Sequence, residues 1–278
     1  MEYIFKQTSV HQKDIENYSN LLSSVFTETK KFTTDFIKWQ YTENPNGNVI
    51  GFDAYDGDVL VGHYVTIPVV YKINDKSTKG LLSLNTATHP NHQGRGLFTQ
   101  LAEKTFQLAK DLGYEFVIGV ANQNSTPGFL KKLGFYKIAA LDVKIGIGSI
   151  QSNITNHVKI SAVWNNQSIH WRLNNPSNQY FIGKNEVLAS TGKINTYAIM
   201  SHLSSNFISN KLLKKTVLLN LKLWIGLSPE LNCKGIFFNL PDKFKPSPLN
   251  LIFKDLSGQL PIFKKEHVHF DLIDFDAY

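Results

Sequence analysis

The feature that most constrains this chain is a strand, a glycine-rich loop, a helix and a second strand that follow one another directly. Gly80–Thr88 has the composition of a strand, and Leu97–Leu112 places apolar residues at helical spacing. Gly113 stands where a helix C-cap glycine is expected. Glu115–Ala121 is then typical of a short strand in a buried parallel sheet. The sequence therefore predicts a βαβ unit.

The loop of this unit has the composition of an anion-binding site. It reads THPNHQGRGLF from Thr88 to Phe98, with Gly94 and Gly96 just before the helix. A strand-to-helix turn directs backbone N–H groups toward one point, where the helix dipole adds positive potential. Glycines let a phosphate approach the backbone closely, so a pyrophosphate is the expected ligand. No Lys-Ser/Thr pair follows and no third glycine has dinucleotide-binding spacing, which excludes a Walker A loop and a Rossmann loop.

The rest of the first half is expected to alternate strands with helices. Pro68 is expected to interrupt a strand, and Asp56-Gly57-Asp58 is a hairpin turn signal. The expected strands are Ile4–Gln7, Asn48–Tyr55, Val59–Val65, Val69–Ile73 and Phe135–Ile147, and the expected helices are residues 11–28 and Pro127–Leu133.

The second half begins after Ile145–Thr155, where Gly, Ser and Asn accumulate. We interpret this segment as a junction between domains of residues 1–148 and 149–278. A helix is expected over Lys211–Trp224, and no second glycine-rich loop precedes it.

The two halves share a short pattern. Residues 36–47 read FIKWQYTENPNG and residues 168–178 read SIHWRLNNPSN, so each has a Trp followed by Asn-Pro. A repeat of this kind implies two similar folds. Coincidence is the alternative, because Asn-Pro is a common start of a turn.

Charge is distributed unevenly over a chain of net charge +7. Residues 1–150 carry 15 Lys/Arg against 14 Asp/Glu, and the remainder carries 14 against 8, so the two parts have net charges of +1 and +6. The basic part fits a phosphate-bearing partner, and solubility alone is the alternative interpretation. No element interleaves basic and aromatic residues as a nucleic-acid surface does, so no nucleic-acid partner is expected.

Composition excludes several other classes. The content of 42% hydrophobic and 18% charged residues excludes a mostly disordered chain. Cys233 is the single cysteine, which excludes an internal disulfide, and neither histidine pair (His89/His92, His267/His269) has a spaced third ligand, so no metal site is expected. Neither a signal peptide nor a membrane-spanning run is evident, so a cytoplasmic protein without a membrane partner is expected.

The loop and its surroundings resemble the GNAT superfamily of acyl-CoA-dependent N-acyltransferases. That family's loop reads Gln/Arg-x-x-Gly-x-Gly/Ala, and Gln93, Gly96 and Phe98 occupy its three defining positions. Leu133-Gly134-Phe135 matches the end of the family's next short helix, and the resemblance covers residues 1–147. It implies an α/β (α+β) fold with two tandem GNAT-like domains, each a mixed, mostly antiparallel sheet flanked by helices. The second domain lacks the CoA loop and would lie on the acceptor side.

By this resemblance acyl-CoA is the cosubstrate, and no metal takes part. The loop amides would bind the pyrophosphate of CoA, and the separated strand ends would hold the pantetheine arm. Asn122 would contact the arm from the other side, or act only as a strand-end cap. The implied CoA-binding residues are Thr86, Ala87, Thr88, Gln93, Gly94, Arg95, Gly96, Leu97, Phe98, Asn122, Ser125 and Phe129.

The chain departs from the family pattern at two positions. Phe98 replaces the final Gly or Ala of the loop, which is tolerable if the ring faces the core. The tyrosine that protonates the departing thiolate in the family would fall near Phe129 or Leu130, and neither can donate a proton. A CoA thiol has a pKa of about 8.5 by analogy with cysteine, so it can leave without strong acid assistance.

Four residues are candidates for handling the acceptor amine, each with an ordinary core or surface role as the alternative. His63 is expected to face the cleft as a base, and Asn85 to hold a water. Asp274 and Asp276 stand two apart, which on a strand gives one acidic face that suits a substrate ammonium.

The acceptor expected from the resemblance is the amine of a nucleotide-linked amino sugar. A tandem GNAT arrangement of this kind resembles the bacterial enzymes that acylate such sugars for surface polysaccharide, including lipopolysaccharide O-antigen. A dTDP- or UDP-linked sugar carries a diphosphate that the basic second half would suit, and the acyl group would be acetyl or larger, such as hydroxybutyryl. The alternatives are an N-acetyltransferase acting on a peptide, a polyamine or an aminoglycoside, and a non-catalytic acyl-CoA-binding protein. The sequence leaves the oligomeric state open.

Overall fold

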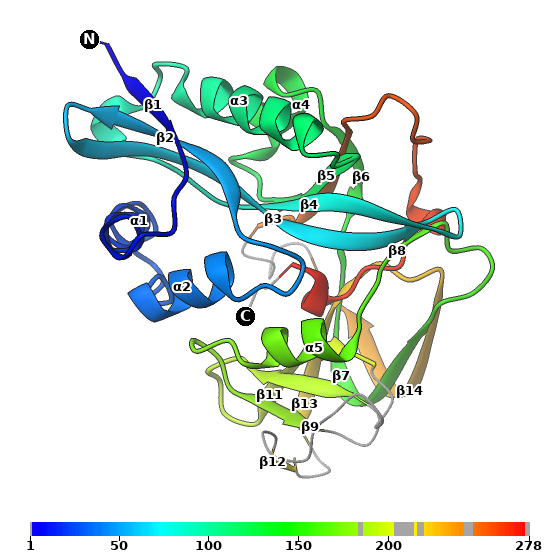
Figure 1. The fold of residues 1–278 in the computed structure, drawn as a ribbon. Coiled ribbons are helices and arrows are strands. Elements are labelled where there is room, and N and C mark those ends of the chain that lie inside the picture. The colour runs from blue at the N-terminus through cyan, green and yellow to red at the C-terminus, as the bar shows by residue number, and fades with distance from the viewer. Residues whose placement is uncertain (1, 183–185, 203–213, 216–219, 242–246, 276–278) are drawn as a thin grey trace.

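The βαβ unit lies at the centre of a mixed sheet in the computed structural model (Figure 1). β4 (Lys76–Thr88) is followed by α3 (Leu97–Asp111) and β5 (Phe116–Ala121), and β4 pairs with β5 in parallel, as predicted. The structure describes residues 2–182, 186–202, 214–215, 220–241 and 247–275.

The first sheet has the strand order β1-β2-β3-β4-β5-β15-β6, with β8 paired to β3. Helices α1 and α2 lie on one face of this sheet, and α3 and α4 on the other (Figure 1). The bounds of the remaining elements are β1 (Ile4–Gln7), α1 (Gln12–Val25), α2 (Thr34–Thr42), β2 (Ile50–Asp56), β3 (Val59–Ile73), η1 (Pro90–His92), α4 (Thr126–Lys132), β6 (Tyr136–Ala140), β8 (Ile160–Ala162) and β15 (Asn250–Asp255).

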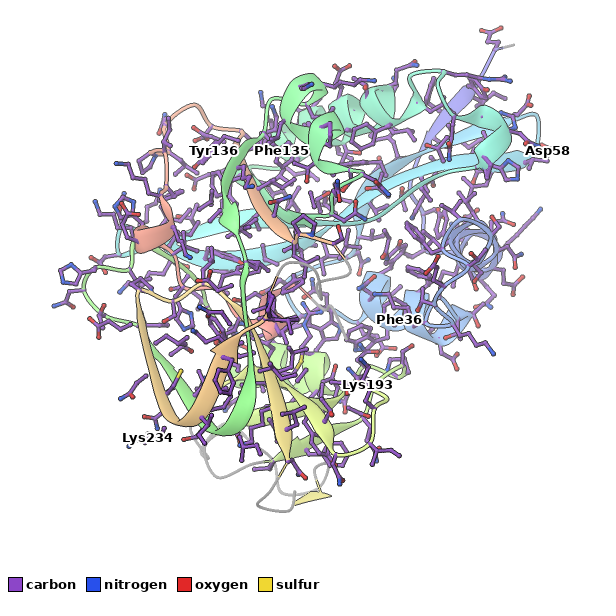
Figure 2. All side chains as sticks on the ribbon, turned by 180° about the vertical axis from the view of Figure 1, so that it is seen from behind. Phe36, Asp58, Phe135, Tyr136, Lys193 and Lys234 are labelled. Carbon is purple, nitrogen blue, oxygen red and sulfur yellow. The ribbon has the colours of Figure 1, made fainter. Side chains whose placement is uncertain are left out.

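The second sheet has the strand order β12-β9-β10-β11-β13-β7-β14. Helix α5 lies between this sheet and α2, and one hydrophobic core includes residues of both sheets (Figure 1). β14 is an edge strand of this sheet, and its exposed Lys234 is labelled in Figure 2. The bounds are β7 (Asp142–Asn153), α5 (Asn166–Leu173), β9 (Tyr180–Ile182), β10 (Val187–Ser190), β11 (Thr196–Ser201), β12 (Lys214–Lys215), β13 (Leu221–Gly226), β14 (Glu230–Asn239), η4 (Lys265–His267) and η5 (Leu272–Asp274).

The two sheets repeat the same pairing directions. β2-β3-β4 and β9-β10-β11 are antiparallel, and each series ends in a parallel pair, β4 with β5 and β11 with β13. The next strand in each sheet is antiparallel. In the first sheet β15, which comes from the second half of the chain, lies beside β5. In the second sheet β7, which spans residues 148 and 149, lies beside β13. The mixed α/β architecture with two helix-flanked sheets is the fold class that the sequence predicts.

The expected strand break at Pro68 needs correction. Pro68 does not interrupt the strand, because β3 runs unbroken from Val59 to Ile73. Pro68 pairs only with Leu81 of β4, since β2 has ended opposite Thr66 and β8 begins opposite Tyr71. The missing N–H therefore falls where β3 has no partner on that side.

The segment Ile145–Thr155 is not a linker, since residues up to Asn153 belong to β7. Its glycines reflect close contact with β14 instead. Gly148 lies opposite Gly235, and a Cβ on Gly148 would lie 2.1 Å from the Lys234 carbonyl oxygen. Likewise the expected single strand Phe135–Ile147 divides after β6, because β6 and β7 enter different sheets.

The described part of Lys211–Trp224 contains strands and not the expected helix. Lys214–Lys215 and Leu221–Trp224 lie in strands β12 and β13, and the other residues of that segment are outside the described ones. Leu221, Leu223 and Trp224 of that segment lie on β13, where Trp224 is buried. In the described parts of the chain, none of the helices is long and apolar enough to cross a membrane.

Candidate active site

The loop between β4 and α3 leaves the start of the helix uncapped. Gly96 is the N-cap residue of α3 and makes no side-chain cap, so the first-turn amides of the helix have no partner of that kind. Gly94 and Gly96 have φ of 74° and 77°, a backbone region that favours glycine. A Cβ on Gly94 would meet nothing within 4 Å, so the approach to these amides is open. This geometry suits an anion.

The N-terminus of the chain holds the loop in place. The Arg95 guanidinium donates to the Tyr3 hydroxyl at 2.9 Å, and that hydroxyl lies 2.9 Å from His92 Nδ1. The Gln93 side chain reaches back to the Thr88 carbonyl at 3.4 Å. Sequence reasoning missed Tyr3, since nothing local connects it to residues some ninety positions later.

The neighbouring strands separate as expected. The β4–β5 pairs end at Ser83 and Gly119, although β4 continues to Thr88 and β5 to Ala121. A register shift between β3 and β4 produces a bulge at Asn85, which has a φ of 47°. The edge of β4 from Asn85 to Thr88 is therefore available to an extended ligand, with Ala87 buried and Thr86 and Thr88 half-buried.

The turn from β5 to α4 is organised by Asn122. Its Oδ1 accepts from the backbone N–H groups of Asn124 and Ser125 and from the Ser125 hydroxyl, at 2.9–3.1 Å. Asn122 is thus a strand-end cap, the alternative role named above, while its side chain is still exposed beside the strand gap. β15 supports this turn, because Asn250 Nδ2 donates to the Thr126 hydroxyl at 3.0 Å.

Phe98 is accommodated by packing rather than by space for a ligand. Its ring lies edge-on to Tyr64 and to Phe129, with centroid distances of 5.9 and 5.3 Å. Gly128 leaves room for it, since a Cβ there would lie 3.1 Å from the Phe98 ring. Phe129 is buried and packs against Phe135, so at this position the chain offers no hydroxyl.

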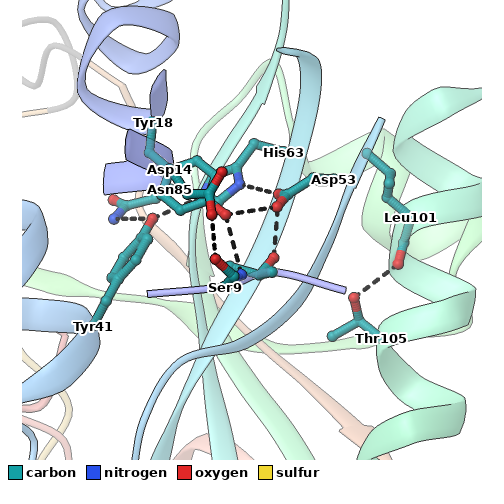
Figure 3. Close-up of polar contacts among 10 residues, drawn as sticks. Ser9, Asp14, Tyr18, Tyr41, Asp53, His63, Asn85, Leu101 and Thr105 are labelled. Atoms are coloured by element: carbon teal, nitrogen blue, oxygen red, sulfur yellow. Dashed lines mark hydrogen bonds and ion pairs between the residues drawn. The ribbon is translucent and has the colours of Figure 1, made fainter. Parts of the chain in front are cut away.

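A buried hydrogen-bonded chain leads from the core to the β4 bulge (Figure 3). Asp53 Oδ1 lies 2.6 Å from His63 Nδ1, and His63 Nε2 lies 2.8 Å from the Tyr41 hydroxyl. Asn85 Nδ2 donates to the Tyr41 hydroxyl at 3.2 Å and to Gln40 Oε1 at 2.5 Å.

The carboxylate at the base of this chain decides the direction of each bond. An Nδ1–H on His63 donates to Asp53, so Nε2 accepts from the Tyr41 hydroxyl. Tyr18 and Thr8 donate to the same carboxylate at 2.8 and 3.2 Å. Since both Nδ2 hydrogens of Asn85 are used, its Oδ1 points away from Tyr41 and Gln40.

His63 therefore does not face a cleft. It is fully buried, stacked on the Tyr18 ring at 4.4 Å, and separated from Asn85 by Tyr41. The sequence expectation fails because β3 alternates its faces: a Cβ on Gly62 would meet Leu101 of α3, so His63 faces α1 and α2 instead. Burial raises the pKa of Tyr41 far above its usual range, so this hydroxyl keeps its proton.

Asp274 lies elsewhere, in η5 rather than on a strand. Its carboxylate is buried and accepts from Trp164 Nε1 and from the Asp271 N–H, both at 2.8 Å. Burial, then the nearby Asp271, raises the pKa of Asp274 to about 6. The expected acidic strand face is not formed at Asp274, and Asp276 lies outside the described residues.

A groove of about 540 Å³ opens between α2 and α5. Its floor includes Trp39 and Trp171, whose rings stack at 5.1 Å, and no Lys or Arg is among its described lining residues. The lining residues are Trp39, Glu43, Pro45, Asn166, Gln167, His170, Trp171 and Asn174. Among the described residues, no group of three His, Cys, Asp or Glu side chains could hold a metal ion.

Known proteins match this chain in both sequence pattern and fold. Residues 7–139 match the family model of the acetyltransferase (GNAT) domain. No curated protein matches the sequence.

Solved structures of low sequence identity share the fold over nearly the whole chain. A probable N-acyltransferase from Enterococcus faecalis V583 is 9% identical, with a TM-score of 0.61 over 93% of this chain and 74% of its own. A GCN5-related N-acetyltransferase from Anabaena variabilis is 14% identical, with a TM-score of 0.60 over 91% and 73%. Eis1 from Mycobacterium abscessus is 10% identical, with a TM-score of 0.56 over 93% and 75%.

The family match covers the loop, the separated strands and the uncapped helix described above. GNAT domains use acyl-CoA as cosubstrate. Residues 7–139 therefore match a GNAT acetyltransferase domain, which supports an acyl-CoA-dependent N-acyltransferase. The solved structures share the fold of the chain.

Proposed function

We propose that this enzyme transfers an acyl group from acyl-CoA to the amine of a nucleotide-linked amino sugar, through a tandem pair of GNAT-like domains. The observation that carries the placement of CoA is the uncapped start of α3, which opens beside the gap between β4 and β5. Amides of the loop residues 93–98 would bind the pyrophosphate. Thr86–Thr88 on one side and the Asn122–Ser125 turn on the other would border the pantetheine arm.

Asn85 is the proposed contact for the acceptor amine. Its Oδ1 is turned away from the buried chain, and the residue sits at the bulge where β4 has left β5. There it would accept a hydrogen bond from the amine, or from a water that takes the amine proton. His63 acts through Tyr41 as a positioning residue, because it holds the hydroxyl that holds Asn85.

The tandem arrangement is supported by the repeated pairing directions of the two sheets and by the contact between the repeated segments. Trp39 Nε1 donates to the Trp171 carbonyl at 2.9 Å, and Trp171 Nε1 donates to the Trp39 carbonyl at 3.2 Å. Two helices related by a pseudo-twofold axis make such reciprocal contacts.

The nucleotide-linked acceptor is supported by the charge of +6 carried after residue 150. The α2–α5 groove contributes no cation among its described lining residues, so a diphosphate would have to meet lysines elsewhere in the second half. The groove's indoles, amides and single carboxylate suit the sugar part of such a molecule better.

The test is acyl transfer from acetyl-CoA and hydroxybutyryl-CoA to a panel of amines, followed by thiol release and product mass. The panel holds dTDP- and UDP-linked amino sugars, the free amino sugars, an aminoglycoside, a polyamine and a peptide. Transfer only to the nucleotide-linked sugars supports the proposal. Preference for another amine overturns the acceptor, and CoA binding without transfer to any amine would indicate a non-catalytic acyl-CoA-binding protein.

A further inference from the structure

The point where β4 and β5 separate carries a hydroxyl pair that the functions above leave unused. Ser83 and Gly119 form the last pair of the parallel ladder. Ser83 is half-buried, and the Tyr64 hydroxyl of β3 lies 3.0 Å from its Oγ. Tyr64 itself is fully buried.

This pair faces α3 and α4. Tyr64 packs edge-on against Phe98 and Phe106 of α3, at centroid distances of 5.9 and 5.7 Å. Gly119 keeps the side of Ser83 open, because a Cβ there would lie 3.4 Å from the Ser83 Cβ. Ser83 therefore lies at the edge of the gap between β4 and β5, and Gly119 has no side chain that would cover it.

We propose that the Ser83 hydroxyl donates a hydrogen bond to the sulfur of CoA as the thiolate leaves, with the Tyr64 hydroxyl as its positioning partner. This inference rests on the proposed placement of CoA. From Thr88 to Ser83 the strand advances about 16 Å, which is comparable to an extended pantetheine arm. An arm that starts at the pyrophosphate loop and follows β4 inward thus brings its sulfur to Ser83.

The chemistry fits a donor that keeps its proton. The amine lone pair forms the new C–N bond, the C–S bond breaks, and its electron pair stays on sulfur. The proton lost from nitrogen goes to water or a base on the acceptor side. Burial holds the pKa of Tyr64 far above its usual range, so Tyr64 keeps its proton. Either hydroxyl can donate in this contact; in the proposed arrangement Tyr64 donates to Ser83 Oγ, which leaves the Ser83 hydrogen for the sulfur. Phe129, by contrast, brings only a phenyl ring to this face.

The experiment measures the pKa of the thiol of bound CoA by the ultraviolet absorbance of its thiolate. A Cys233→Ala background makes CoA the only thiol, since Cys233 is exposed and is the single cysteine. A hydrogen bond to the thiolate lowers its pKa, so Ser83→Ala should raise the measured pKa by about one unit. Ser83→Thr, which keeps the hydroxyl, should restore the unaltered value, and Tyr64→Phe should give a smaller rise.

Two matched controls share the strands of the tested residues. Ser77→Ala changes an exposed serine of β4, and Tyr71→Phe changes a buried tyrosine of β3, so neither should move the thiol pKa. A Ser83→Ala protein that binds CoA with the thiol pKa of the Ser77→Ala control overturns the inference. Failure of the unaltered protein to bind CoA overturns the proposed CoA site itself, so the two failures are distinguishable.

Discussion

At the residue scale, the loop before α3 depends on backbone that only glycine adopts without strain. Gly96 combines a φ of 77° with the N-cap position, so its own N–H and those that follow point out of the helix start. The N-cap residue brings no side-chain hydrogen bond to them, whereas Ser, Thr, Asp or Asn commonly cap a helix. A helix start left open in this way is suited to a ligand that supplies the missing acceptors.

Gly96→Glu should raise the dissociation constant for CoA at least about 100-fold, because a carboxylate would repel the pyrophosphate and fill its place. Isothermal titration calorimetry measures this. The matched control is Gly113→Glu at the other end of α3, where φ is 80° and a Cβ also meets open space. Equal losses of affinity in the two variants would contradict the proposed pyrophosphate position.

Tyr41→Phe tests the buried chain. It removes the link between His63 and Asn85 and leaves His63 Nε2 without its donor, so the free energy of unfolding should fall by about 1–3 kcal/mol. If Asn85 positions the amine, kcat should fall about tenfold while the KM for acyl-CoA is unchanged.

The control for this prediction is Tyr71→Phe. Within the described part of the chain the buried Tyr71 hydroxyl has no hydrogen-bond partner, so its loss should cost neither stability nor activity. A Tyr41→Phe enzyme that is destabilised but retains full kcat would show that the hydrogen bonds from Asp53 to Asn85 serve stability alone.

At the element scale, helices α2 and α5 form one contact through two tryptophans. The reciprocal hydrogen bonds and the 5.1 Å ring stacking join a helix of the first half to a helix of the second. Arg172 adds its guanidinium 4.5 Å from the Trp171 ring. The contact lies in the core shared by both sheets, so it fixes how the two sheets face each other.

A double-mutant cycle of Trp39→Phe and Trp171→Phe measures this contact. Each phenylalanine removes one indole N–H hydrogen bond and part of the ring packing. Each carbonyl keeps a backbone donor, Glu43 N–H for Trp39 and Asn174 N–H for Trp171, so each change should cost about 1–2 kcal/mol in chemical denaturation. The two changes should be coupled by about 1–2 kcal/mol. Trp39→Phe combined with Trp224→Phe, which lies in a separate cluster of the second sheet, should be additive; coupling of similar size there would contradict a specific α2–α5 contact.

At the scale of the whole molecule, the two halves complete one another. β15 comes from the second half and lies between β5 and β6. The chain leaves the first sheet after β6, and β7 lies between β13 and β14 in the second sheet. Asn250 donates a hydrogen bond to Thr126, and Ser247 Oγ accepts one from the Gln123 N–H, so both support the β5–α4 turn beside the proposed CoA site. A division into residues 1–148 and 149–278 therefore describes a proposed repeat rather than two separable folding units.

Buried acids on η5 make this assembly sensitive to pH. Burial raises the pKa of Asp271 to about 7, against the lowering effect of hydrogen bonds from Trp224 and Ser152. Because the folded state holds the proton more tightly, this group's contribution to stability is complete below a pH of about 4 and is lost as pH rises through about 7. Asp274 acts in the same direction with its pKa of about 6.

Asp271→Asn should therefore raise the melting temperature at pH 8 relative to the unaltered protein and have little effect near pH 4. Melting curves over this range by circular dichroism measure the difference. The matched control is Asp58→Asn at the exposed hairpin turn, which should leave the pH dependence unchanged. A melting temperature of Asp271→Asn that tracks the unaltered protein at every pH would show that Asp271 is not the group responsible.

What the sequence determined by itself was local. The spacing of apolar residues and the turn glycines placed the helix α3, the strands around it and the glycine-rich loop before it, because these depend on neighbours within one or two turns. Asp53 carried a weak signal, as a lone carboxylate within an apolar strand, and its role was missed.

Only the tertiary structure decided the rest. Whether His63 faces solvent or core depends on which face of β3 is covered by α1 and α2, and the amide orientation of Asn85 depends on Tyr41 and Gln40 from another element. In sequence the glycines of β7 are typical of a linker. In the structure they pair with β14, which leaves no room for side chains at these positions. Strand exchange between the sheets joins residues more than a hundred positions apart, such as Asn250 and Ala121, and no local pattern encodes such a pairing.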